Sequence, residues 1–94
     1  MTRVTIRIPT PLRSYTGGAN EVSADGTTVG EVLDALSHKH KELVARVLAE
    51  DGSIRQFVNI YRGNDDIRAL HGLATTVAEG DVLSIIPAVA GGTL

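Results

Sequence analysis

TVGEVLDAL, residues 28–36, contains the clearest helix signal of the chain. Thr28 and Glu31 form a capping box, in which the threonine hydroxyl accepts from the amide of Glu31 and the carboxylate reaches back to the amide of Thr28. Apolar residues recur at the spacing of one helix face, namely Val29, Val32, Leu33 and Leu36. This single apolar face predicts a helix that packs against a sheet.

The segment after this helix also has a helical pattern. The basic run 38–41 is expected at the helix end, where the helix dipole favours cations. A second amphipathic segment follows, with Leu43, Val44, Val47 and Leu48 as its apolar residues, and stops at the turn Asp51-Gly52. On a helix His38 and His40 would point in nearly opposite directions, so no metal site is predicted for them.

Strand patterns lie on both sides of the helical region. Residues 4–8 alternate between apolar and polar and are expected to pair with a short strand at 21–23. Residues 57–61 are rich in β-branched and aromatic side chains and are expected to form a second hairpin with 67–68. The last strand is expected at 82–86, after the turn Gly80-Asp81.

This order of elements predicts an α+β domain with the ubiquitin-like β-grasp fold. In this fold a helix covers one face of a mixed sheet and the final strand returns to the middle. Residues 1–87 are expected to form the domain, and residues 88–94 a flexible C-terminal tail. A chain of 94 residues suffices for one core and leaves no room for a second domain.

Composition excludes several classes of function. The formal net charge is −2, with Lys and Arg spread along the chain, which argues against a nucleic-acid partner. There is no cysteine, which excludes disulfides, thiolate metal sites and a thiol nucleophile. No apolar run approaches the roughly 20 residues of a membrane span, and no leader is legible, so no membrane partner and a cytoplasmic location are expected.

The last predicted strand presents apolar residues on both faces. Leu83 and Ile85 share one face, and Val82, Ser84 and Ile86 share the other. Because a helix covers the sheet on one side only, one of these sets faces water. We expect a partner surface here, formed by Val82, Ser84, Ile86, Pro87 and Phe57. The alternative is that a small two-layer fold simply exposes some apolar side chains.

The residues after this strand suit passage through a narrow channel. Ala88, Val89, Ala90 and Gly91 are small or uncharged, and Gly91 with Gly92 lets the backbone approach another protein closely. Residues 87–92 span about 20 Å when fully extended. The alternative is a frayed end without a function.

Three motifs carry a resemblance to a known family. They are FVNIY (residues 57–61), GLAT (residues 72–75) and PAVAGG (residues 87–92). The opening VTIRIPTPLRSYTGG and the capped helix agree with them, so the resemblance covers nearly the whole chain. The chain resembles the MoaD/ThiS family of ubiquitin-like sulfur-carrier proteins, and within it the CysO type that serves cysteine biosynthesis.

The resemblance implies that the carboxylate of Gly92 is the reacting group. In the family an E1-like adenylating enzyme of the MoeB/ThiF type uses ATP to form an acyl-adenylate, and a sulfur donor displaces AMP to leave a thiocarboxylate. Further implied partners are a sulfur-accepting synthase, such as a cysteine synthase, and a JAMM-type metalloprotease. ATP belongs to the partner enzyme, so no bound cofactor and no metal are expected, and the chain itself is a protein cosubstrate rather than an enzyme.

The sequence departs from the family pattern after Gly92, where Thr93 and Leu94 follow. With these residues attached, the carboxyl group of Gly92 lies in a peptide bond and cannot be adenylated. Three explanations stay open: a protease removes the two residues, they were added for expression, or this copy is inactive as a carrier.

Other functions stay open beside the sulfur carrier. They are the small subunit of molybdopterin synthase, a protein modifier that forms isopeptide bonds with lysines, and a binding module with an inert tail. No Ser/His/Asp arrangement, phosphate loop or dinucleotide fingerprint is present, so catalysis by the chain itself is not expected. Asp65-Asp66 is interpreted as part of a turn with Gly63-Asn64 rather than as an acid–base pair.

Overall fold

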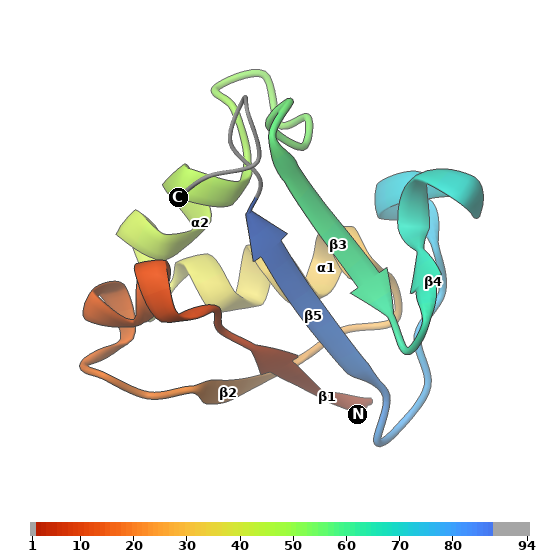
Figure 1. The fold of residues 1–94 in the computed structure, drawn as a ribbon. Coiled ribbons are helices and arrows are strands. Elements are labelled where there is room, and N and C mark those ends of the chain that lie inside the picture. The colour runs from red at the N-terminus through yellow and green to blue at the C-terminus, as the bar shows by residue number, and fades with distance from the viewer. Residues whose placement is uncertain (1, 88–94) are drawn as a thin grey trace.

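A five-stranded mixed sheet forms one layer of the protein (Figure 1). The structure is a computed structural model that describes residues 2–87. Its strands are β1 (Arg3–Arg7), β2 (Glu21–Asp25), β3 (Val58–Arg62), β4 (Asp65–Asp66) and β5 (Val82–Pro87). Its helices are α1 (Val29–Ser37) and α2 (Lys41–Val47), with the 3₁₀ turns η1 (Thr10–Thr16), η2 (Ile67–Ala69) and η3 (Gly72–Ala74).

The last strand lies in the middle of the sheet, as predicted. The strand order is β2-β1-β5-β3-β4. β5 runs parallel to β1 and antiparallel to β3, while β1 with β2 and β3 with β4 are antiparallel pairs. The mixed sheet with its covering helix confirms the ubiquitin-like β-grasp fold.

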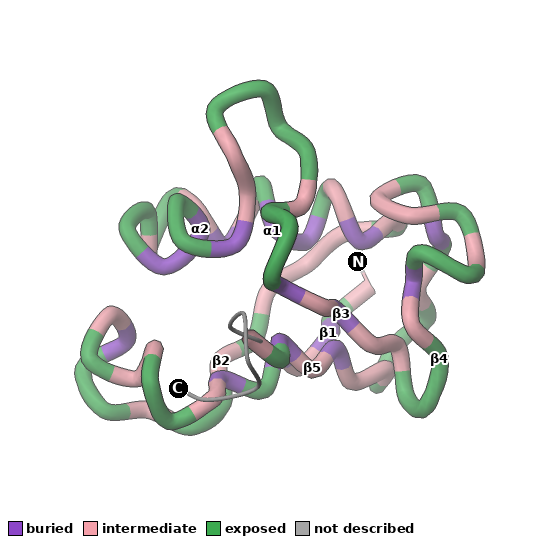
Figure 2. The backbone as a smooth tube through the Cα atoms, turned by 45° about the horizontal axis from the view of Figure 1, so that its top comes forward, coloured by how far each residue is buried: buried purple, intermediate pink, exposed green. Residues whose placement is uncertain are grey.

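Helices α1 and α2 cover one face of the sheet, and the core lies between the two layers (Figure 2). The four predicted apolar residues of α1 are all at most 2% exposed. Alternate residues of β1, β3 and β5 meet them, as do three residues of α2; they are Val4, Ile6, Ile8, Val58, Ile60, Leu83, Ile85, Leu43, Val44 and Val47. Within residues 2–87 no helix has the length and apolar character needed to cross a membrane.

The start of α1 differs in one contact from the predicted capping box. Thr28 Oγ1 accepts from the amide of Glu31 at 3.2 Å, as predicted. The Glu31 carboxylate, however, accepts from the amide and hydroxyl of Thr27, at 2.9 and 2.6 Å, and not from the amide of Thr28. Thr28 forms an antiparallel bridge with Thr76, which orders the backbone before the helix and brings Thr27 to the carboxylate.

Apart from shifts of one or two residues at the ends of β1, β2, β3 and β5, two predicted elements were placed wrongly. α1 ends at Ser37 and α2 begins at Lys41, so Lys41 opens the second helix instead of ending the first. The strand that pairs with β3 is Asp65–Asp66 rather than 67–68. Its turn is tighter than predicted because Gly63 takes a φ of 61°, a conformation that favours glycine.

The residues after β4 turn inward. The Asp66 carboxylate accepts from the amide of Arg68 at 2.9 Å and caps η2, while Ile67 is fully buried. A strand at 67–68 would compete with this cap and with the burial of Ile67. Asp66 therefore caps η2, but it lies in β4 and not in the turn predicted for it.

The contact between Glu31 and Thr27 predicts a pH-dependent stability. Hydrogen bonds from the hydroxyl and the amide of Thr27 hold the pKa of Glu31 below its ordinary value. A lowered pKa means that this stabilisation is present above the unfolded-state pKa and is lost as the pH falls through the folded-state pKa. We expect Glu31→Gln to lower the urea midpoint at pH 7 slightly. Below pH ~5 the midpoint of this variant is expected to fall less steeply with decreasing pH than the midpoint of the parent protein.

The control is Glu50→Gln, because no hydrogen bond to the Glu50 carboxylate occurs among residues 2–87. It removes the same charge from another exposed position. Urea midpoints measured at several pH values would contradict the prediction if Glu31→Gln and Glu50→Gln gave the same profile.

Candidate functional site

The outer face of β5, which points away from the helices, carries three of the predicted partner residues, Val82, Ser84 and Ile86. Leu83 and Ile85 are buried at 1% and 2% exposure, so the pleat turns Val82, Ser84 and Ile86 to the opposite face. Ile86 is 46% exposed and is one of two large apolar side chains exposed within residues 2–87. The alternation predicted along this strand is therefore confirmed, and the set that faces away from the helices is Val82, Ser84 and Ile86.

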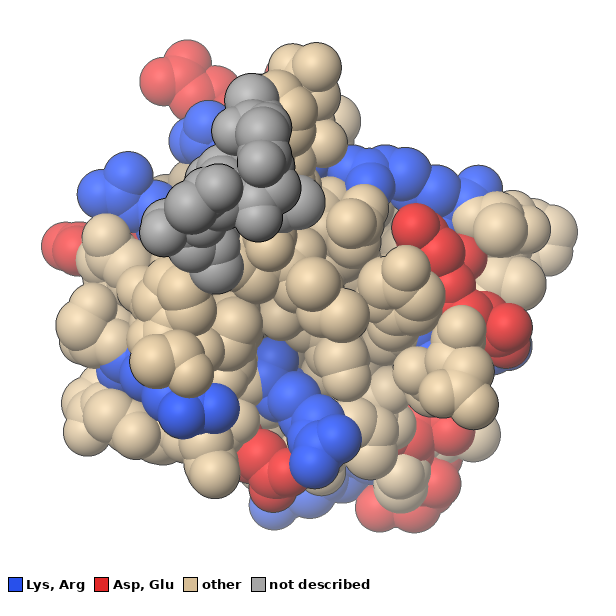
Figure 3. All heavy atoms as spheres, viewed as in Figure 1, with Lys and Arg blue, Asp and Glu red and all other residues tan. Residues whose placement is uncertain are grey.

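Neighbouring strands extend this surface. Asn59 of β3 pairs with Ile86, and Tyr61 of β3 pairs with Ser84, so all four share a face with Val82. We call Asn59, Tyr61, Val82, Ser84 and Ile86 the outer-face patch. The space-filling view shows that uncharged side chains occupy the middle of this side of the molecule, with charged side chains around them (Figure 3).

Charged residues on β1 and β2 border the outer-face patch on one side. Arg7 lies beside Ser84 in the parallel pair of β1 and β5 and forms an ion pair with Glu21 at 3.4 Å. A second exposed pair joins Arg3 and Asp25, also at 3.4 Å. Exposed pairs of this kind add little stability, so their main effect is to separate the uncharged area from the edge of the sheet.

Arg68 borders the outer-face patch on the other side. Its Nη1 donates to Asn59 Oδ1 at 2.6 Å, and its Nη2 donates to the carbonyl of Arg55 at 3.1 Å. These bonds fix an exposed guanidinium beside β3. The sequence interpretation named neither Asn59 nor Arg68 as a site residue. The alternation of the predicted strand at 57–61 places Asn59 on the same face as Tyr61. No sequence signal predicts that Arg68 contacts Asn59.

Phe57 and Pro87 lie where β3 begins and β5 ends. Phe57 precedes β3 and is 49% exposed. Pro87 pairs with Val58, which is buried, so the pleat places Pro87 on the helix side and not with Ile86. Phe57 thus lies near the strand end from which residue 88 follows, whereas Pro87 turns away from the outer-face patch. The predicted tail residues Ala88, Val89, Ala90, Gly91 and Gly92 lie outside the described residues, as do Thr93 and Leu94.

Three carboxylates of the described part, those of Glu31, Asp51 and Asp66, accept hydrogen bonds in turns or at helix starts. The pKa of Asp51 lies below its ordinary value because the hydroxyl and amide of Ser53 donate to the carboxylate. His38 ends α1 and His40 precedes α2, so they do not share one helix as the sequence interpretation assumed. Within residues 2–87 no three His, Cys, Asp or Glu side chains gather as potential metal ligands.

Comparisons with known proteins agree on one family. The model of the ThiS family matches residues 6–92. The chain is 45% identical over 91 residues to the sulfur carrier protein CysO of Mycobacterium tuberculosis, which covers 95% of this chain and 98% of that protein. It is 44% identical over 72 residues to small archaeal modifier protein 1 of Haloferax volcanii, which covers 76% of this chain and 78% of that protein.

A solved structure has the same fold. The crystal structure of the Amycolatopsis orientalis BexX/CysO complex contains a chain that superposes with a TM-score of 0.87 at 44% identity. The superposition covers 95% of this chain and 99% of that chain.

Proposed function

The chain belongs to the ThiS family, and on this premise we propose that it is a sulfur carrier whose reacting group is the carboxylate of Gly92. The observation that carries the proposal is the extent of the family match, which begins within β1, includes the other four strands and ends at Gly92. The similarity to CysO over nearly its full length supports a carrier for cysteine biosynthesis or for another sulfur-containing metabolite.

The chemistry takes place in two substitutions. An oxygen of the Gly92 carboxylate attacks the α-phosphorus of ATP on an E1-like adenylating enzyme of the MoeB/ThiF type, and pyrophosphate leaves. A sulfur nucleophile then attacks the carbonyl carbon of the acyl-adenylate, and AMP leaves with the bonding electron pair. A free carboxylate is a poor acceptor for sulfur, so activation to the mixed anhydride is required.

The outer-face patch supports this proposal because it offers a docking surface next to the start of the segment that carries Gly92. Ile86 of this patch is exposed near the end of β5. Phe57, which lies just before the adjacent β3, is also exposed. A partner that binds this patch holds the domain while residues 88–92 enter its channel, which raises the effective concentration of the carboxylate at the catalytic site. We propose the same surface for the sulfur-accepting synthase.

Intact mass spectrometry tests the sulfur transfer. A chain that ends at Gly92 is incubated with ATP, a sulfide source and the adenylating enzyme of the same organism. We expect a sulfur-for-oxygen mass increase that fragmentation assigns to the C-terminal residue. Omission of ATP is the control and is expected to abolish the increase. No mass change with any adenylating enzyme of the organism would contradict the proposal.

A second candidate function is protein modification. It is favoured by the 44% identity to small archaeal modifier protein 1. In that case the acyl-adenylate is attacked by a lysine amine of a target protein, which forms an isopeptide bond. Conjugates of higher mass in extracts of cells that express a tagged chain distinguish this function from sulfur transfer, because the transfer to small acceptors leaves the carrier unconjugated.

A further inference from the structure

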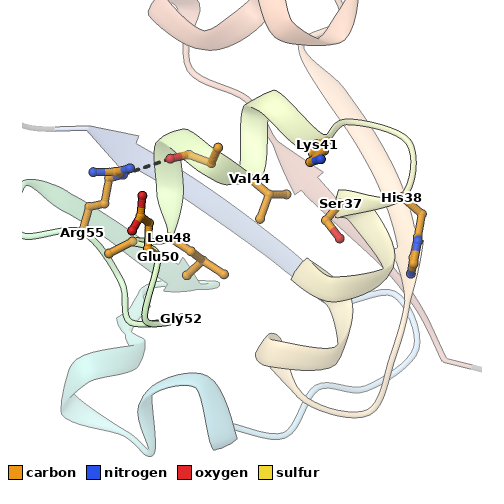
Figure 4. A pocket seen from close by; sticks show the side chains of 10 residues that line it. Ser37, His38, Lys41, Val44, Leu48, Glu50, Gly52 and Arg55 are labelled. Carbon is orange, nitrogen blue, oxygen red and sulfur yellow. Dashed lines mark hydrogen bonds between the residues drawn. The ribbon is translucent and has the colours of Figure 1, made fainter.

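A shallow groove of about 600 Å³ lies on the helix-bearing side of the molecule (Figure 4). The end of α1, one side of α2 and the loop before β3 form its walls. Val44, Ala45 and Leu48 provide apolar surface within it. Its charged side chains belong to Lys41, Arg55 and Glu50, and His38 also lines it.

The groove favours a small anion attached to an apolar segment. Lys41 and Arg55 are both exposed, and the ion pairs among residues 2–87 join Arg3 to Asp25 and Arg7 to Glu21, so neither Lys41 nor Arg55 has a carboxylate partner there. Arg55 Nε donates to the carbonyl of Ala45 at 3.0 Å, which holds the guanidinium against α2 (Figure 4). The groove lining thus contains two cations, Lys41 and Arg55, and one carboxylate, that of Glu50.

One end of the groove lies close to the end of β5. Val58 pairs with Pro87, and the amide of Val58 donates to the carbonyl of Arg55 at 3.1 Å. Arg55 is therefore near the point from which residue 88 follows. Residues 88–92 have the sequence AVAGG, which contains no charged side chain, and they reach at most about 16 Å when extended.

We propose that residues 88–92 of the carrier ending at Gly92 bind in this groove of the same molecule. The terminal carboxylate is attracted by the positive charges of Lys41 and Arg55 in the groove lining, and Val89 contacts the apolar surface beside α2. This inference rests on the proposed function for the end at Gly92. Because the segment is tethered, its effective concentration is in the millimolar range, and weak contacts suffice to populate the bound state.

The bound state would compete with the partner enzymes. A carboxylate attracted to the cations of the groove has to leave it before residues 88–92 can enter a catalytic channel. The outer-face patch is on the opposite side of the sheet from the helices, so a partner can dock there while the segment is still bound in the groove. Docking on the patch and release of the segment are then separate steps.

Paramagnetic relaxation measured by NMR tests this proposal. The chain contains no cysteine, so Ala90→Cys in the ¹⁵N-labelled chain ending at Gly92 gives one site for a nitroxide label. We expect the strongest broadening at the groove amides of Ala45, Ala49 and Gly52 and none at Gly80, which precedes β5 at its other end.

Charge variants make the test specific. Lys41→Glu is expected to lower the broadening of the groove amides about fivefold, which corresponds to the upper value of an exposed ion pair. Lys39→Glu is the matched control, since it makes the same charge change two residues away outside the groove lining, and is expected to change nothing. Arg55→Gln removes the other cation, keeps a donor for the carbonyl of Ala45, and is expected to act like Lys41→Glu.

Several results would overturn the proposal. They are broadening spread evenly over the exposed amides, broadening centred on the outer-face patch, and equal broadening in the Lys41→Glu and Lys39→Glu variants. Broadening that fades on dilution would assign the groove to the segment of a second molecule and would also overturn it. The measurement uses neither ATP nor sulfide, so its outcome is distinguishable from a failure of the sulfur-transfer assay.

Discussion

The chain that ends at Gly92 is expected to release pyrophosphate from ATP in the presence of its adenylating enzyme, whereas the chain that keeps Thr93 and Leu94 is expected to release none above background. The effect is all-or-none because only a free carboxylate oxygen can attack the α-phosphorus. In a peptide bond to Thr93 that oxygen belongs to an amide. A pyrophosphate-release assay with both chains measures the difference.

Cleavage during the assay has to be controlled. Intact masses taken before and after the reaction show whether the longer chain still carries both residues. The control for the preparation of a variant protein is Thr76→Ala in the chain ending at Gly92. Thr76 is exposed and lies away from β5, so this variant is expected to be as active as the parent. Release of pyrophosphate by the uncut longer chain at the rate of the chain ending at Gly92 would refute the assignment of the reacting group.

Replacement of Ile86 by Glu is expected to lower kcat/KM for adenylation about 30-fold, which corresponds to the loss of one interface hot spot of roughly 2 kcal/mol. Ile86 is 46% exposed on the outer-face patch, so the free domain tolerates the change. In the complex, the carboxylate would lose its hydration without gaining a partner. Kinetics with the chain ending at Gly92 measure the effect, with thermal unfolding to verify the fold.

Ser23→Glu provides a matched control for this variant. Ser23 is exposed on the same face of the sheet, but on β2, and β1 separates it from β5. It is expected to change kcat/KM less than threefold, within the range of energetically neutral interface positions. Equal losses for Ile86→Glu and Ser23→Glu would mean that net charge, rather than contact with the outer-face patch, controls the reaction.

Periodicity predicted the parts of the fold in which one face of an element is buried. The buried side of α1 and the two faces of β5 follow from the positions of apolar residues, because burial of one face requires that pattern. The cap by Thr28 also follows from sequence, since donor and acceptor are three residues apart. The apolar residues and the capping residues that determine these elements lie within a few positions of one another in the sequence.

The parts that were missed depend on contacts between distant segments or on local hydrogen bonds without an apolar pattern. η1 was not predicted. Thr16 is buried in that turn, and its single hydroxyl hydrogen is shared between the carbonyls of Arg13 and Ala19, at 3.1 and 2.9 Å. The Glu31 carboxylate meets Thr27 instead of Thr28 in a backbone bridged to Thr76.

In the candidate site, too, the local pattern was predicted and the contact between distant segments was missed. The alternation along β5 predicted that Val82, Ser84 and Ile86 share a face, but it also separates Pro87 from them, which the sequence interpretation overlooked. Arg68 reaches Asn59 only because the hairpin of β3 and β4 and the turn η2 bring them together. The spacing of Asn59 and Arg68 in the sequence does not predict that contact.

The position of β5 also constrains when this protein can fold during its synthesis. β1 and β3 both pair with β5, which is synthesised after them, so the central ladders of the sheet cannot close while β5 is still inside the exit tunnel. The sheet of the nascent chain would therefore stay open until β5 has left the tunnel. An interrupted or truncated translation product would then present neither a docking surface nor a usable terminus, and would be left to proteolysis.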